Sequence, residues 1–231
     1  KSSQTFELVQ KMQEEITGFL VECSRESIGD QTAHNLNNMV RIAAKLESIA
    51  DTSDKLMRLA ARRADKDIKL DEDTLTEIQS YSELVKEFLE LITATYSASM
   101  DRWRQVFPPE GDFAAHWGLM HRGTVMLRDD SAMNLSPEMF REFIEPYDQR
   151  LLSRYGGGAI HFCGRGDHYI DRMPQMDGVY AVNLSQPEYN DMERIFRHTI
   201  DRGIQIIGLK RDAADAALEN GRDLHGNVHC L

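Results

Sequence analysis

Proline and glycine are distributed very unevenly along this 231-residue chain. All six prolines follow residue 107, and thirteen of the fifteen glycines follow residue 100. Because proline breaks helices and glycine weakens them, only the first hundred residues are free to form long helices. The distribution therefore predicts two domains, residues 1–105 and 112–231, with a boundary near Pro108 and Pro109.

Apolar residues in the first domain recur at three- and four-residue steps, which is typical of helices with one buried face. Three such stripes run through Phe6–Cys23, Leu36–Ala60 and Leu75–Ile92. Thr74 and Glu77 have the spacing of a capping box at the start of the third helix. The pattern predicts an antiparallel helical bundle of about three helices.

Short apolar runs alternate with helical segments in the second domain. We expect strands at residues 124–127, 159–163, 179–184 and 204–209. A helix should begin after Ser136, break near Pro146 and end at the glycines 156–158, and another should open at Ser185 and end at Gly203. This α/β alternation predicts a parallel sheet, with four units that amount to half of a (β/α)8 TIM-type barrel.

The composition excludes several classes of partner. The chain has 38 acidic and 27 basic residues, a formal net charge of −11, so we expect no nucleic acid or anionic membrane surface as partner. No apolar run approaches the ~20 residues of a membrane span, and no signal peptide is evident. Three scattered cysteines form no disulfide framework, which favours a cytoplasmic location.

A histidine and a cysteine end the second predicted strand. Side chains alternate along a strand, so His161 and Cys163 share one face, at the carboxyl end where barrel active sites lie. An imidazole and a thiolate on one face can bind zinc, and Cys230, after the fourth strand, could supply a third ligand. The pair is also compatible with a buried imidazole beside a small apolar thiol.

Asp129 and Asp130 follow the first strand of this domain. A carboxylate at the carboxyl end of a strand can bind substrate, accept a proton or contact a metal ion. An aspartate in this position can also serve only to cap a helix or stabilise a turn. We expect Asp129 to be a catalytic residue and Asp130 to bind substrate.

Several stretches between about His116 and Cys230 resemble the uroporphyrinogen decarboxylase superfamily. They are Met126–Asp130, Leu135–Phe140, Ile144–Tyr147 and His161–Gly164. The resemblance implies a (β/α)8 barrel, of which only the carboxyl-terminal half is present. The superfamily contains tetrapyrrole decarboxylases and zinc enzymes that transfer methyl groups from corrinoid carriers to thiols.

In those methyltransferases an H-x-C pair and a later cysteine bind zinc. The resemblance therefore implies His161, Cys163 and Cys230 as zinc ligands, a corrinoid methyl donor, and a small-molecule or corrinoid-protein substrate. The arginine-rich segment and the aspartate on which the decarboxylases rely cannot be located in this chain.

The first domain, from about Phe6 to Ile92, is similar to a PhoU-like helical domain of sodium/phosphate cotransporters. Glu22–Asp30 and Leu46–Asp51 lie at the two ends of the stretch that carries the similarity. The similarity is incomplete, and it implies a regulatory module of phosphate transport.

Three functions remain open from the sequence. The first is zinc-dependent methyl transfer to a zinc-bound thiol, the second is the non-enzymatic PhoU-like module, and the third is tetrapyrrole decarboxylation. Four strands cannot close a barrel, so we expect a homodimer or a missing half-barrel partner to cover the edge strands. An incomplete barrel is also compatible with an inactive protein.

Overall fold

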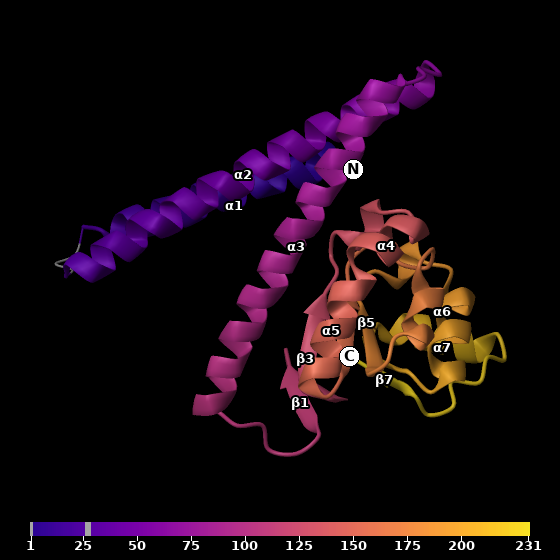
Figure 1. Ribbon diagram of the computed structural model, residues 1–231. Coiled ribbons are helices and arrows are strands. Elements are labelled where there is room, and N and C mark those ends of the chain that lie inside the picture. The colour runs from indigo at the N-terminus through magenta and orange to yellow at the C-terminus, as the bar shows by residue number, and fades with distance from the viewer. Residues whose placement is uncertain (1, 26–28) are drawn as a thin grey trace. The chain divides into compact units, whose positions relative to one another are not determined.

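The computed structural model describes the backbone of residues 2–25 and 29–231, and the side chains of residues 9–25, 29 and 31–231. Glu26–Ile28, which belong to the stretch similar to a PhoU-like domain, lie outside the described residues. The chain forms two compact units, Lys1–Glu77 and Ile78–Leu231. An N-terminal helical region thus precedes an α/β region, as the sequence predicts (Figure 1).

The first unit is built on two long helices. Helix α1 (Ser2–Cys23) and helix α2 (Asp30–Asp65) pack side by side and run antiparallel (Figure 1). Leu20 in α1 and Ala43 in α2 are buried, whereas most other apolar side chains of this unit are half exposed. Both helices follow the apolar stripes that predict them.

Helix α3 (Glu72–Val106) belongs to both units, because the division at residues 77 and 78 falls within it. The helix ends at Val106, just before Pro108 and Pro109. The two compact units, however, divide at residues 77 and 78 and not at the predicted boundary near Pro108, because residues 78–106 pack with the α/β region. At its start, the Asp71 carboxylate accepts a hydrogen bond of 2.8 Å from the backbone N–H of Thr74. Asp71 therefore caps this helix, and the predicted capping box at Thr74 is wrong.

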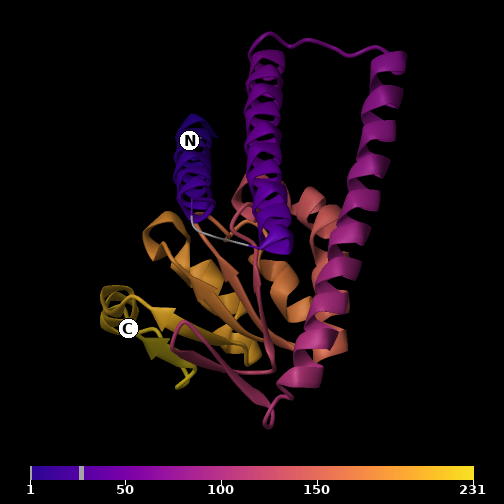
Figure 2. The ribbon, with the colours of Figure 1, turned by 90° about the vertical axis from the view of Figure 1, so that its left-hand side faces the viewer.

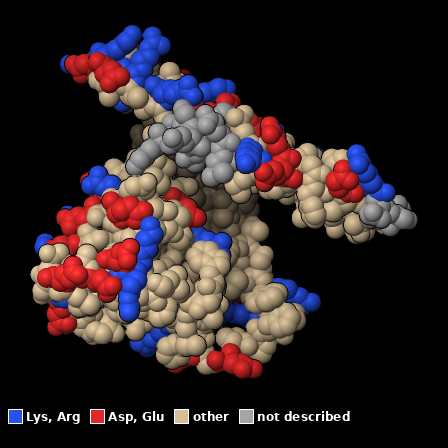
Figure 3. Space-filling model, turned by 180° about the vertical axis from the view of Figure 1, so that it is seen from behind, with Lys and Arg blue, Asp and Glu red and all other residues tan. Residues whose placement is uncertain are grey.

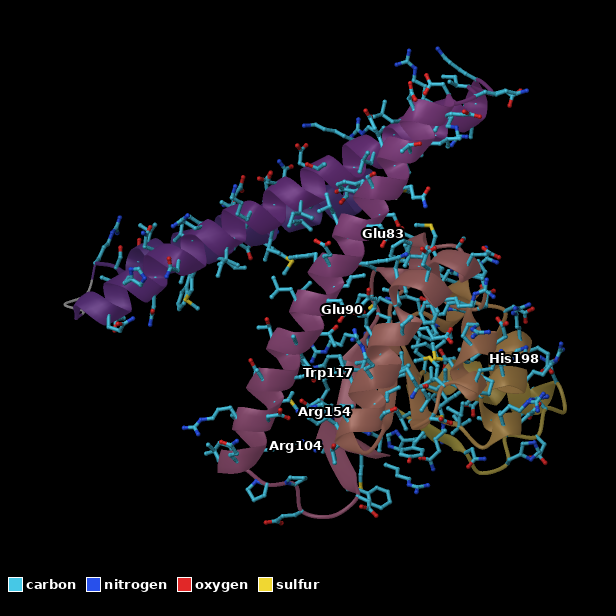
Figure 4. The ribbon with its side chains drawn as sticks, in the orientation of Figure 1. Glu83, Glu90, Arg104, Trp117, Arg154 and His198 are labelled. Carbon is cyan, nitrogen blue, oxygen red and sulfur yellow. The ribbon has the colours of Figure 1, made fainter. Side chains whose placement is uncertain are left out.

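The second half of α3 packs against α5 (Glu145–Tyr155) of the α/β unit, as Figure 4 shows around Glu90, Arg104 and Arg154. Arg154 forms a salt bridge of 2.5 Å with Asp101, and Arg150 forms one of 2.8 Å with Glu90. Tyr96 and Met100 of α3 pack against the main core. Residues 78–106 therefore form a covering helix of the α/β unit.

The α/β unit contains one parallel sheet of five strands, visible in Figure 2. The strands follow the chain order β3 (Val125–Arg128), β4 (Gly158–Phe162), β5 (Val179–Leu184), β6 (Gln205–Leu209) and β7 (Val228–Cys230). The first four coincide with the predicted strands to within one residue at each end. The fifth strand was not predicted, because three residues are too few to show a period-two pattern.

The segments between these strands are α4 (Pro137–Phe143), α5, α6 (Met192–His198) and α7 (Arg211–Glu219), joined by short 3-10 turns. Ser136 caps α4, the predicted break occurs at Ile144, and Gly156 ends α5 in the left-handed conformation. Helix α6 begins later than predicted from Ser185. Residues 187–189 form a separate 3-10 turn, and the Asp191 side chain caps α6 through the N–H of Arg194.

Different elements pack against the two faces of the sheet. One face packs against the helices in the main core, which contains Ile160, Phe162 and Val182. On the other face, Leu119 packs against four small or medium-sized side chains. These are Met126, Ala159, Ala181 and Ile207.

Leu119 belongs to a β-hairpin that the sequence analysis did not predict, formed by β1 (Phe113–His116) and β2 (Leu119–Arg122). The hairpin approaches the sheet very closely at Gly208. A Cβ atom there would lie 2.9 Å from both the Leu119 side chain and the Asn183 amide nitrogen. The hairpin is therefore fixed against this face of the sheet by packing.

Acidic and basic side chains are interspersed over the face of the α/β unit that Figure 3 shows. Among the described residues, none of the helices combines the length and the apolar character needed to span a membrane.

The close contact between β3 and β4 gives a first test of the fold. A Cβ atom on Gly158 would lie 1.8 Å from the backbone carbonyl oxygen of Val125, and a backbone atom cannot rotate away. We expect Gly158→Ala to lower the free energy of unfolding by about 3 kcal/mol or more, measured by urea titration. Gly18→Ala is the control, because Gly18 lies in α1 and a Cβ atom there would meet no atom within 4 Å beyond its chain neighbours and the backbone of its own helix. An equal stability of both variants would contradict the strand register.

Candidate metal centre

Three side chains capable of binding a metal converge at the carboxyl ends of β3 and β4. They are Asp130, His161 and Cys163, and one ligand atom from each lies within 4.8 Å of the other two. The Nε2 atom of His161 is 3.1 Å from a carboxylate oxygen of Asp130 and 3.4 Å from the sulfur of Cys163. The backbone N–H of Asp129 donates to the carbonyl of His161 over 2.7 Å, which fixes the two strand ends together.

The alternation of side chains along the strands explains why these groups meet. Met126 and Ala159 face the hairpin side of the sheet, so Asp130 and His161, at even steps along the chain, face the same side. Cys163 follows His161 by two residues and continues this face. The sequence predicted the pairing of His161 with Cys163, and the parallel register of β3 against β4 adds Asp130.

Asn183 of the neighbouring strand β5 holds the His161 ring. The amide nitrogen of Asn183 donates to the carbonyl of Ile207 over 2.6 Å, so its oxygen faces Nδ1 of His161 at 2.5 Å. This oxygen can only accept a hydrogen bond, so Nδ1 carries the proton. In the neutral ring Nε2 then presents a lone pair to Asp130 and Cys163, which is the tautomer that a metal ligand needs.

The Cys163 thiol is partly buried, and burial raises its pKa above the ordinary value. A contact of 3.5 Å with the Ser185 hydroxyl lowers the pKa, while the hydrogen bond and negative charge of Asp130 raise it further. Cys163 is therefore a protonated thiol at neutral pH unless a cation is bound nearby.

The three side chains differ in their exposure to solvent. His161 is 6% exposed, whereas the Asp130 side chain is 53% exposed. An imidazole nitrogen, a carboxylate oxygen and a sulfur atom thus meet at an opening to solvent. All three can donate an electron pair, and a cation placed between them would satisfy them together.

Asp129, expected to be catalytic, lies on the opposite face of the sheet. It is 8% exposed and forms a hydrogen-bonded pair with Asp148 of α5, which requires one shared proton. Burial raises the pKa of Asp129 to about 7; the hydrogen bond from Asp148 lowers it and the charge of Asp130 raises it. Burial also raises the pKa of Asp148 well above its ordinary value.

One carboxylate oxygen of Asp129 and one of Asp148 have no hydrogen-bond partner among the described residues, and the same is true of the buried Tyr169 hydroxyl. The pair is therefore costly to ionise and lies on the other face of the sheet from Asp130, His161 and Cys163.

Cys230 lies on β7, which is three strands away from β4 in the sheet. Its side chain packs against the main core on the helix-covered face. Within the described part of the chain, the ligand atoms that come together are those of Asp130, His161 and Cys163, and Cys230 is not one of this group. The sequence could not show that Cys230 lies far from Cys163, because that distance depends on the order in which the strands pair in the sheet.

Sequence reasoning missed Asn183 and Ser185 as parts of this site. Asn183 follows Ala181 by two residues on a correctly predicted strand, and Ser185 comes directly after the end of that strand at the next even step. The same alternation rule could therefore have indicated their face. Comparison of the chain with models of protein families, with curated proteins and with solved structures finds no match.

The buried acid pair predicts an unusual dependence of stability on pH. Both carboxyl groups have pKa values above the unfolded value of about 3.9, so the stability that they contribute is fully present below about pH 4. It is lost as the pH rises through their folded pKa values, which is about 7 for Asp129. Asp148→Asn removes one of the two titrations. Relative to wild type, its free energy of unfolding should rise by about 1 kcal/mol per pH unit between pH 5 and 7.

The control for this measurement is Asp177→Asn, which replaces an exposed carboxylate of the same unit. Its difference from wild type should stay constant over the same range. A constant difference for Asp148→Asn as well would show that the pair carries no raised pKa.

Proposed function

We propose that this chain binds one zinc ion through Asp130, His161 and Cys163, and that it activates a thiol for methyl transfer at the remaining coordination position. The observation that carries the proposal is the convergence of three different donor atoms within 4.8 Å at the carboxyl end of the sheet. Three protein ligands with one position open to solvent is the pattern of catalytic rather than structural zinc.

The donor set favours zinc over harder cations. A thiolate and an imidazole suit zinc, whereas magnesium and calcium prefer sites made of oxygen atoms. Zinc, when bound, would supply the Lewis acidity that lowers the pKa of a coordinated thiol toward neutrality.

Three residues of the chain would support metal binding and thiol activation. Asn183 fixes the His161 ring with Nε2 free, and Cys163 releases its proton when the metal binds. Asp130 contributes a negative charge at the exposed side of the group, where a substrate would enter.

The resemblance to the uroporphyrinogen decarboxylase superfamily supports methyl transfer as the reaction, with a corrinoid as the methyl donor. A parallel sheet whose spatial order equals the chain order is compatible with part of a (β/α)8 barrel. In this proposal a second copy of the chain or a separate half barrel completes the fold around the site.

Metal analysis of purified variants tests the proposed ligand set. After zinc loading and dialysis, wild type should retain about one zinc ion per chain, measured by inductively coupled plasma mass spectrometry. Cys163→Ser should lower the zinc affinity at least 100-fold, because it removes the thiolate ligand. Cys230→Ser is the matched control and should retain the metal; loss of zinc in this variant alone would contradict the ligand set.

Zinc affinity should also depend on pH. Binding must displace the proton of Cys163, whose pKa is raised, so the affinity should fall about tenfold for each unit of decreasing pH in the neutral range. Competition titrations with a chromophoric chelator measure this slope, and an affinity independent of pH would exclude a thiolate ligand.

A further inference from the structure

Trp117, in the turn between β1 and β2, lies beside His161 of the candidate metal centre. Its indole ring contacts the His161 ring at 4.9 Å between centroids, with the two planes nearly perpendicular. Trp117 remains 55% exposed, whereas His161, which it contacts, is 6% exposed. Trp117 therefore covers part of His161 and presents its own surface to solvent.

The backbone at Trp117 has a conformation that tryptophan rarely adopts. Trp117 and Gly118 form the two-residue turn between β1 and β2, with φ angles of 52° and 79°. Such turns prefer asparagine, aspartate or glycine at their first position, because a bulky side chain is disfavoured at positive φ. An exposed tryptophan kept at this position costs stability, and strain of this kind is concentrated at functional sites.

Two neighbours hold the indole in place. Leu119, two residues further along the hairpin, is buried against the sheet and prevents the turn from moving away. The Arg128 guanidinium lies 4.0 Å from the centroid of the indole and covers part of one face. Trp117 is thus an aromatic surface held beside the His161 imidazole, whose Nε2 atom lies 3.1 Å from a carboxylate oxygen of Asp130.

We infer that Trp117 is a specificity-determining residue, and that its exposed indole surface packs against the apolar or aromatic carbon skeleton of the thiol that binds at the metal. This inference rests on the proposed zinc-dependent activity. In this arrangement the metal held by Asp130, His161 and Cys163 binds the sulfur atom of the thiol, and the indole contacts the carbon group that carries the sulfur. Aromatic rings bury a large area at little cost in conformational entropy, so the selection favours thiols that carry a flat apolar group.

Two thiols with the same donor atom test this selection. Binding of 2-phenylethanethiol and of 2-mercaptoethanol to the zinc-loaded full chain is measured by isothermal titration calorimetry. We expect wild type to prefer 2-phenylethanethiol about tenfold. Trp117→Asn should reduce this preference to below twofold, and Trp117→Phe should retain most of it because phenylalanine keeps an aromatic face.

The Trp117→Asn variant is expected to fold, because asparagine is favoured at the first position of this type of turn. Trp103→Asn is the matched control, because Trp103 is 59% exposed on α3 and forms no part of the metal-binding group. It should keep the tenfold preference. A preference that survives in Trp117→Asn, or that wild type lacks, would overturn the inference.

A measurement on the metal-free chain separates this inference from the proposed function. Carbethoxylation of His161, followed by peptide mass spectrometry, should become at least fivefold faster in Trp117→Asn and stay unchanged in Trp103→Asn. An unchanged rate in Trp117→Asn would show that the indole does not cover the imidazole. Failure of wild type to bind zinc overturns the proposed function and the thiol assignment together, whereas zinc binding without thiol preference overturns only the role of Trp117.

Discussion

The parallel pairing of β3 with β4 is the contact on which the candidate site depends. Arg128 pairs with His161 in the register of the two strands, and the next residue, Asp129, donates its N–H to the carbonyl of His161. A shift by one residue would turn Asp130 to the helix-covered face and separate it from the imidazole. The register is enforced by Gly158, where the two backbones approach too closely for any side chain.

The two adjacent aspartates at the end of β3 point to opposite faces of the sheet and have different environments. Asp129 points into the core and shares a proton with Asp148, while Asp130 points to the opening and remains exposed. The charge of Asp130 raises the pKa of both Asp129 and Cys163, so both groups favour their protonated, neutral forms when no cation is present. A divalent cation would offset the charge of Asp130 and favour the thiolate of Cys163, which is the physical reason why the arrangement suits a metal.

Much of the α/β unit could be predicted from the sequence, because its strands are short apolar runs bounded by glycine, proline and capping residues. The strand at 179–184 and the cap at Ser136 are examples. The hairpin at Phe113–Arg122 and the strand ending at Cys230 could not be predicted, since their sequences are too short or too polar to show a period. The pairing of His161 with Cys163 follows from alternation alone. The addition of Asp130 required the register between strands, which no local pattern contains.

X-ray absorption spectroscopy at the zinc edge tests the central claim most directly, because it counts the sulfur ligands of the bound metal. The ligand set of Asp130, His161 and Cys163 predicts one sulfur at about 2.3 Å and two or three nitrogen or oxygen atoms at about 2.0–2.2 Å. The sulfur contribution should disappear in any zinc that Cys163→Ser retains. A spectrum with two sulfur ligands in the absence of added thiol, or with none, would contradict the account.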